Sequence, residues 1–141
     1  TGLLKVQALE LLNDDEAADL INVNYAGAVN VARASFPHLA ETKGQLLLFT
    51  SSSYTRGRAN YSLYSSSKAA VVNLVQALAD EWGERGVRIN CINPERTSTP
   101  MRTSNFGHED PATLLDADVV AKRSLQTLAS AVTGEVIDVR R

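Results

Sequence analysis

Tyr64 and Lys68 stand four residues apart in the stretch YSSSK. Residues at this spacing share a face of an α-helix, so a phenol and an ammonium group can meet there. A free phenol has a pKa near ~10, but a cation within ~4–6 Å favours the phenolate. The pair predicts a tyrosine of lowered pKa that exchanges protons with a substrate alcohol or carbonyl. The spacing alone is a weak signal, because most such pairs are surface side chains.

Two other polar residues fit the same chemistry. Ser51 follows an apolar run and lies thirteen residues before Tyr64. A serine at the carboxyl end of a strand can donate to a substrate carbonyl oxygen as charge develops there. The alternative is a serine that merely ends a strand. Asn24 lies inside a predicted helix, where asparagine is unfavourable, so its presence indicates a kink, a bound water or a buried hydrogen bond.

The elements that must position these residues alternate along the chain. The run within residues 45 to 53 is apolar and reads as a strand buried on both faces. Residues 95 to 113 have no period and are predicted to form a long loop. The full predicted order is helix 14–37, strand within 45–53, helix 62–82, strand 87–93, loop 95–113, helix 116–133 and strand 135–139.

This alternation predicts an α/β fold with a doubly wound parallel sheet. Three strands with an all-apolar central run need further cover. We therefore expect additional structure, either removed from this chain or supplied by another copy of it. A start without methionine also suggests a piece of a longer protein.

Composition narrows the function classes. The 141 residues suit one domain, and the net charge of -2 without charged blocks argues against nucleic acid or an anionic membrane as partner. A single cysteine, Cys91, allows no internal disulfide and favours a cytoplasmic location. His38 and His108 lack a cysteine cluster, so no metal site is expected. Neither a membrane-spanning run nor a signal peptide is visible.

Four motifs together resemble the short-chain dehydrogenase/reductase family. They are INVNYAGA, LLLFTSSS, YSSSKAA and GVRINCINPERTSTPM, and with TGEVIDV the resemblance covers nearly the whole chain. It implies a Rossmann-like sheet of which residues 1–141 are the C-terminal catalytic portion. The N-terminal strands and the glycine-rich phosphate turn are missing from this chain. Thr1-Gly2 matches the tail of the family's Asn-Asn-Ala-Gly element.

The resemblance also implies roles. Tyr64 is the acid/base at the substrate oxygen, and Lys68 lowers its pKa and binds the nicotinamide ribose. Ser51 polarises the carbonyl, and Asn24 holds a water of the proton relay. The cofactor expected is NAD or NADP, with NADP slightly favoured. The cofactor-binding positions implied are Tyr64, Lys68, Pro94, Thr97 and Thr99, of which Thr99 matches the threonine that contacts the nicotinamide carboxamide.

The loop after Pro94 departs from the family at Glu95, where glycine is usual, so the loop path is expected to differ. Its sequence and the ending TGEVIDVRR are similar to the reductase portion of bifunctional cytidylyltransferase–reductases of CDP-ribitol-type synthesis. That likeness suggests a ketose or polyol phosphate as substrate, with Arg96, Arg102 or both holding its phosphate. The alternative is that both are solvated loop charges.

Two further expectations concern assembly. The helices near 15–36 and 62–82 correspond to those through which the family commonly forms dimers, so a homodimer or homo-oligomer is expected. A non-catalytic dimerisation or scaffold module with the same fold is the alternative to an enzyme. Because the glycine-rich half is absent, the isolated chain is predicted to be inactive.

Overall fold

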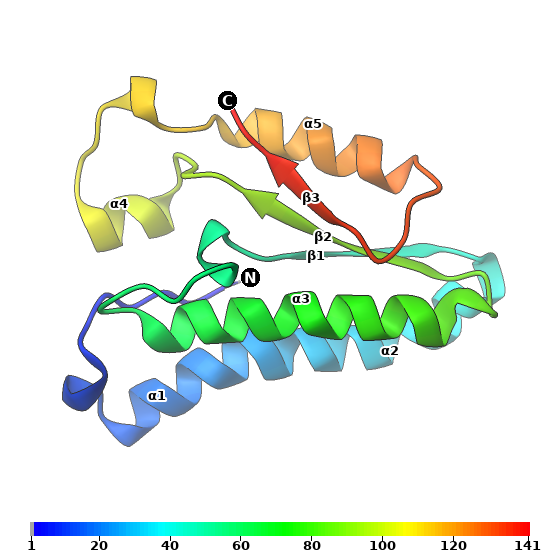
Figure 1. Cartoon of the computed structure of the whole chain (residues 1–141), viewed down its shortest axis with the longest axis horizontal. Coiled ribbons are helices and arrows are strands. Elements are labelled where there is room, and N and C mark those ends of the chain that lie inside the picture. Colours follow the sequence, from blue (N-terminus) through cyan, green and yellow to red (C-terminus); the bar gives the residue numbers. More distant parts are fainter. Residues whose placement is uncertain (1) are drawn as a thin grey trace.

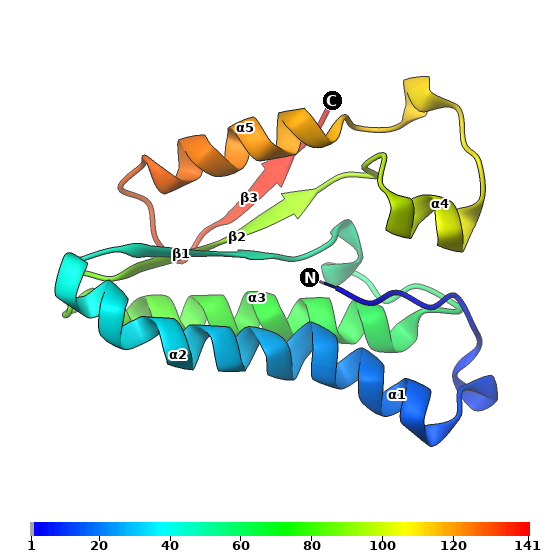
Figure 2. The same ribbon diagram turned by 180° about the vertical axis from the view of Figure 1, so that it is seen from behind.

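The computed structural model describes residues 2–141. Its three strands, β1 (Gln45–Phe49), β2 (Arg88–Pro94) and β3 (Val136–Val139), form one parallel sheet in the order β1-β2-β3. Helices α1 (Asp14–Ile21), α2 (Gly27–Thr42) and α3 (Ser62–Gly83) lie on one side of the sheet. Helix α5 (Ala117–Leu128) lies on the other (Figures 1 and 2). The predicted α/β class with a parallel sheet is confirmed. The prediction on Thr1-Gly2 involves Thr1, which is outside the described residues.

The first helical segment contains the irregularity that Asn24 suggested. Helix α1 begins at a capping box in which Asn13 and Glu16 bond each other's backbone N–H. Residues Asn22–Ala26 then form a π-helical turn before α2 begins. Such turns interrupt the regular hydrogen-bond ladder and occur frequently at functional sites. The helix continues past Pro37 to Thr42, so its predicted end was too early.

The main core lies between α3 and the sheet. Val71 and Val75 of α3 pack with Ile89 and Cys91 of β2, and none of these side chains is more than 1% exposed. Trp82 extends the cluster toward α2. The predicted apolar stripe of α3 is therefore largely confirmed, and its buried side chains fix the helix, with Tyr64 and Lys68 near its start, against β2.

Strand β1 differs from its prediction. Its residues are half-buried rather than buried, and Phe49 is 46% exposed. The reason is its place in the sheet, because β1 pairs with β2 on one edge and with no other strand within residues 2–141. An apolar edge strand of this kind fits the expectation that the sheet needs further cover.

The predicted long loop is partly ordered. It contains helix α4 (Pro100–Phe106) and a short 3₁₀ turn at Pro111–Thr113. Thr99 caps α4 by accepting a hydrogen bond of 3.2 Å from the Arg102 N–H, and Pro100 occupies the first turn. The helix was missed because seven residues are too few to show an apolar period.

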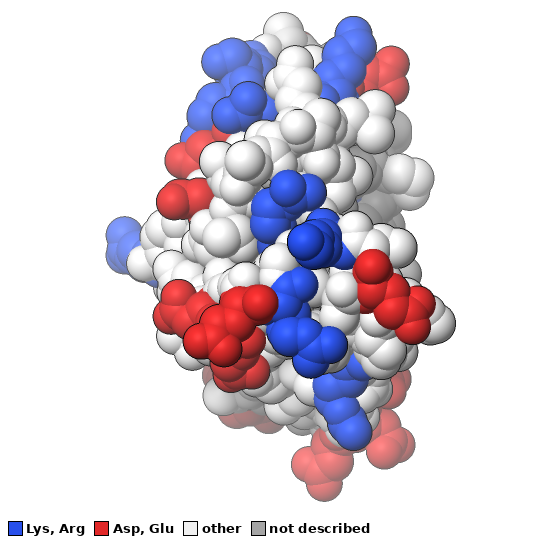
Figure 3. Space-filling view, turned by 90° about the vertical axis from the view of Figure 1, so that its right-hand side faces the viewer, with Lys and Arg blue, Asp and Glu red and all other residues white. Residues whose placement is uncertain are grey.

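Charge is mixed at the end of the molecule where the strands begin. Figure 3 shows Lys and Arg side chains in a band on this face, with Asp and Glu side chains on both sides of it. No helix within residues 2–141 is long and apolar enough to cross a membrane. The same residues contain no group of three or more side chains arranged to hold a metal ion.

Candidate active site

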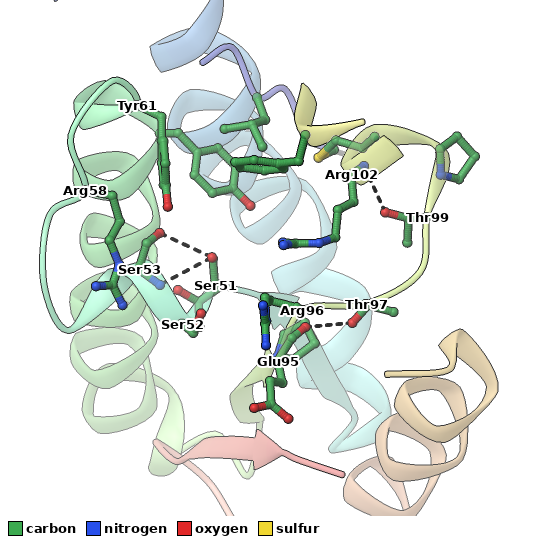
Figure 4. A pocket seen from close by; sticks show the side chains of 17 residues that line it. Ser51, Ser52, Ser53, Arg58, Tyr61, Glu95, Arg96, Thr97, Thr99 and Arg102 are labelled. Carbon is green, nitrogen blue, oxygen red and sulfur yellow. Dashed lines mark hydrogen bonds between the residues drawn. The ribbon is translucent and has the colours of Figure 1, made fainter. Parts of the chain in front are cut away.

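A cavity of about 600 Å³ opens at the carboxyl ends of β1 and β2. This is the edge of a parallel sheet where ligands usually bind. Helix α4 covers the cavity on one side, and the start of α3 forms the other (Figure 4). The predicted residues that line it are Ser51, Tyr64, Pro94, Arg96, Thr97, Thr99 and Arg102.

Tyr64 and Lys68 meet on one face of α3, as their spacing predicted. The Lys68 ammonium lies 5.7 Å from the centre of the Tyr64 ring. It donates a hydrogen bond of 3.0 Å to the carbonyl oxygen of Phe49 at the end of β1. Lys68 is only 6% exposed, so its charge sits beneath the cavity rather than in solvent.

The expected lowering of the Tyr64 pKa is not found in this structure. Burial raises the pKa of Tyr64, and the nearby Ser51 side chain opposes that rise in part. Desolvation also lowers the pKa of Lys68. The physical reason is that both groups are removed from water while the ammonium is directed at the Phe49 carbonyl. Tyr64 is therefore a neutral phenol at neutral pH.

Ser51, Ser52 and Ser53 all line the cavity, and hydrogen bonds fix the orientation of Ser51. Its Oγ accepts hydrogen bonds from the Ser53 hydroxyl (3.2 Å) and from the Ser53 N–H (3.4 Å), both drawn in Figure 4. Ser53 itself is only 4% exposed. Thr50 ties this strand end to α3 by donating a hydrogen bond of 2.8 Å to the Lys68 carbonyl oxygen.

Asn24 is buried in the π-helical turn and does not line the cavity. Its side chain exchanges two hydrogen bonds with the backbone of Leu3, at 2.8 and 2.7 Å. A Cβ atom built on Gly2 lies 3.5 Å from Asn24 Oδ1 and 3.8 Å from Lys68 Nζ, so the N-terminal segment passes beside both. The Asn24 amide is thus engaged with this segment, and its role in a water relay stays a prediction.

The loop after β2 places Pro94, Thr97 and Thr99 on the cavity wall. Thr97 donates a hydrogen bond of 2.8 Å to the Glu95 carbonyl oxygen and forms a β-bridge with Leu115. These contacts fix the loop, but they do not test contact with a nicotinamide.

Glu95 takes the family's glycine position without filling the cavity with its carboxylate. Its N–H donates to the Val139 carbonyl oxygen (3.0 Å), and its carboxylate accepts from the Arg141 N–H (3.3 Å). Figure 4 shows the carboxylate turned toward β3. This contact gives a structural reason for the departure from glycine.

Arg102 is not free to bind substrate in this structure. It forms a two-pronged ion pair with Glu109, with N–O distances of 2.6 and 2.8 Å, and its guanidinium lies 4.8 Å from the Phe106 ring. The hydrogen bond from Arg102 is the main cause that lowers the pKa of Glu109. The suggestion that Arg102 is a solvated charge is wrong, and its role as a phosphate ligand would require this pair to break.

Sequence reasoning missed several cavity residues, among them Arg58 and Tyr61. Arg58 comes from the loop before α3, where the sequence indicates a turn at Gly57 but no site residue. Tyr61 packs edge-to-face against both Tyr64 and Phe106, at ring distances of 6.4 and 6.0 Å. The position of Tyr61 one helical turn before Tyr64 is the signal that could have identified it.

Comparison with known proteins gives the class of protein. Residues 1–110 match the family model described as short chain dehydrogenase. A Salmonella enterica serovar Typhi structure described as a short chain dehydrogenase superposes with a TM-score of 0.89 at 32% identity, covering 98% of this chain and 59% of that one. The chain belongs to the short-chain dehydrogenase/reductase family.

A more specific likeness is to one curated relative. The chain is 53% identical over 138 residues to the bifunctional ribulose 5-phosphate reductase/CDP-ribitol pyrophosphorylase Bcs1 of Haemophilus influenzae, covering 98% of this chain and 29% of the relative. It is 44% identical over 97 residues to the uncharacterized oxidoreductase YciK of Escherichia coli, covering 68% of this chain and 38% of the relative. The chain thus spans less than two fifths of either relative.

Proposed function

We propose that residues 1–141 are the catalytic portion of an NAD(P)-dependent oxidoreductase that interconverts a carbonyl and an alcohol. The observation that carries this proposal is the meeting of the Tyr64 and Ser51 hydroxyls in one cavity beside the buried Lys68 ammonium. Family membership supports the reaction class. A pure interaction module has no physical need for these three groups at the carboxyl edge of the sheet.

The residues present suit the nicotinamide half of the cofactor. Lys68 is buried and does not line the cavity, but it keeps donors beyond the one given to Phe49, which suits ribose hydroxyls. Thr99 lines the cavity itself. The bound nicotinamide supplies or accepts the hydride. A 3-ketoacyl-(acyl-carrier-protein) reductase of Brucella melitensis, 26% identical over 99% of this chain and 62% of its own, forms a complex with NADH.

The Tyr64 hydroxyl, in one cavity with Ser51, supports a role as the proton donor, and its raised pKa agrees with that role. A phenol that stays protonated at neutral pH is the proton donor in the reductive direction. Ser51 donates a hydrogen bond to the carbonyl oxygen as negative charge develops on it. Tyr64 then gives its proton to that oxygen, and the product is the alcohol. The positive charge of Lys68 stabilises the phenolate that remains.

The substrate proposed is a ketose phosphate, reduced to a polyol phosphate. It is supported by the likeness to a relative whose name includes ribulose 5-phosphate reductase, and by arginines on the cavity wall. The chain covers 29% of that bifunctional relative. The likeness therefore supports the further proposal that a cytidylyltransferase domain belongs to the same polypeptide.

The test uses a polypeptide that joins this chain to a glycine-rich cofactor-binding half. NADH and NADPH oxidation is followed with ribulose 5-phosphate as substrate. Tyr64→Phe should lower kcat by roughly 10²- to 10⁴-fold, the usual contribution of a general acid. Tyr54→Phe, which alters a tyrosine outside the cavity lining, is the matched control. Turnover by Tyr64→Phe at the control rate would refute the assignment, and turnover by residues 1–141 alone would refute their predicted inactivity.

A homodimer through α2 and α3 is the second proposal. A groove of about 350 Å³ lies on these helices, lined by Val29, Phe36, Leu74, Leu78 and Trp82 among others. Partly buried apolar side chains in a surface groove suit a second copy of the chain. If the protein is only a scaffold, substitutions in this groove prevent oligomer formation, whereas Tyr64→Phe changes neither the oligomeric state nor any activity.

A further inference from the structure

Three guanidinium groups line the cavity, but their surroundings differ. Arg102 is compensated by Glu109 and lies over the Phe106 ring. Arg58 and Arg96 form no side-chain hydrogen bond or ion pair with any other residue of the range 2–141. A guanidinium whose charge already pairs with a carboxylate is a poorer receptor for an anion than one without such a partner.

Arg58 and Arg96 are also held on fixed backbone. The Arg58 N–H donates to Ser65 Oγ at 3.3 Å, which ties the loop to α3. The Arg96 carbonyl oxygen accepts a hydrogen bond of 2.7 Å from the Leu115 N–H. Two cations from separate loops therefore reach one cavity from anchored positions. Anchoring reduces the ordering cost of binding a ligand between them.

We propose that Arg58 and Arg96 bind the phosphate group of the substrate, and that Arg102 instead holds α4 in place. The inference rests on the proposed function, because it assigns the phosphate subsite of the same cavity. A phosphate carries up to about two negative charges near neutral pH and accepts paired hydrogen bonds from guanidinium groups. Figure 4 shows Arg58 beside Ser53 and Arg96 beside Glu95, with Arg102 extending from α4 toward the middle of the cavity.

The nearby carboxylates leave this subsite positive. Glu95 is the acidic residue among those lining the cavity, and its carboxylate faces β3, where it accepts from the Arg141 N–H. Glu109 is engaged mainly by Arg102, and the charge of Arg96 contributes less to lowering the pKa of Glu109. Neither carboxylate neutralises Arg58 or Arg96 through a direct ion pair. The phosphate end of the ligand is therefore attracted to Arg58 and Arg96, and its carbonyl end lies at the Ser51 and Tyr64 hydroxyls.

The first experiment measures inorganic phosphate binding to the chain itself. Arginine Nε–H signals are followed by NMR during a phosphate titration, in the unaltered chain and in Arg58→Gln, Arg96→Gln and Arg102→Gln. Loss of one charge-assisted contact should raise Kd roughly 10-fold or more for the first two variants. Arg56→Gln, in the same loop as Arg58 but outside the cavity lining, should leave Kd unchanged. A larger effect of Arg102→Gln, or equal effects of all four, would overturn the inference.

The second experiment separates this inference from the proposed function. The longer polypeptide is assayed with ribulose 5-phosphate and with unphosphorylated ribulose. Arg58→Gln should raise KM for the phosphorylated ketose alone, whereas Arg102→Gln should affect both substrates alike. If phosphate binds at Arg58 and Arg96 but no ketose phosphate is reduced, the proposed function fails and the subsite stands. If reduction proceeds and Arg58→Gln behaves as the unaltered enzyme, the subsite fails and the function stands.

Discussion

Asn24→Ala tests how the N-terminal segment is held beside Lys68. The substitution removes two hydrogen bonds, from Leu3 N to Asn24 Oδ1 (2.8 Å) and from Asn24 Nδ2 to the Leu3 carbonyl oxygen (2.7 Å). At about 0.5–1.5 kcal/mol each, they hold the segment by about 1–3 kcal/mol. Alanine returns up to about 0.5 kcal/mol of helix propensity. The free energy of global unfolding should therefore fall by only about 0.5–2.5 kcal/mol.

Local release of the N-terminal segment is a sharper readout than global unfolding. The helix around residue 24 is formed whether the segment is bound or released, so the difference in helix propensity between asparagine and alanine cancels. Hydrogen exchange at the Leu3 amide should accelerate roughly 5- to 150-fold, while amides of α3 change only with global stability. Asn30→Ala, an exposed asparagine on α2, is the control and should leave Leu3 unchanged. Equal Leu3 exchange in Asn24→Ala and the unaltered chain would refute this account of the segment.

Three other predictions concern the core, the thiol and the helix groove. Trp82→Ala removes a 6%-exposed ring packed 4.9 Å from Phe36, and urea unfolding should show a loss of about 3–5 kcal/mol. Burial raises the pKa of Cys91 from 9.0 to about 12, so the folded chain holds this proton while the unfolded chain releases it, and stability falls as pH rises through that range. In Cys91→Ala, the free energy of unfolding from urea titrations should fall less steeply with pH, by up to about 1.4 kcal/mol per pH unit. The same pH dependence in both proteins would contradict the burial argument. Leu78→Glu should convert a dimer to a monomer in light scattering, and Asp80→Asn on the exposed side of α3 should not.

Much of the fold follows from local pattern. The period of apolar residues in α3 and the β-rich run of β2 predict both elements, because each buries a continuous face. The exposure of Phe49 was not predictable in the same way. An apolar run indicates that a strand can be buried on both faces, but only the strand order shows that β1 lies at an edge.

Some features of the candidate site could likewise be predicted from the sequence, and others could not. The four-residue spacing predicted that Tyr64 and Lys68 lie together, because residues four apart on a helix share one face. The partner of Arg102 was not predictable, since Glu109 lies beyond a helix that the sequence pattern does not show. The direction of the Tyr64 pKa was also missed. Burial is the largest cause of the raised pKa, and the Ser51 side chain opposes it in part, which spacing along the chain does not show.

The ammonium at the centre of the site depends on an edge strand. Lys68 donates to the Phe49 carbonyl oxygen, and Phe49 ends the strand that has a free edge within residues 2–141. A further strand paired along β1 would fix Phe49, and with it the acceptor that holds Lys68. The same strand would cover the apolar side chain of Phe49, which is now 46% exposed. Completion of the sheet and positioning of the Lys68 charge are therefore coupled through one hydrogen bond. A polypeptide that supplies such a strand should therefore hold the Lys68 ammonium more firmly than residues 1–141 alone.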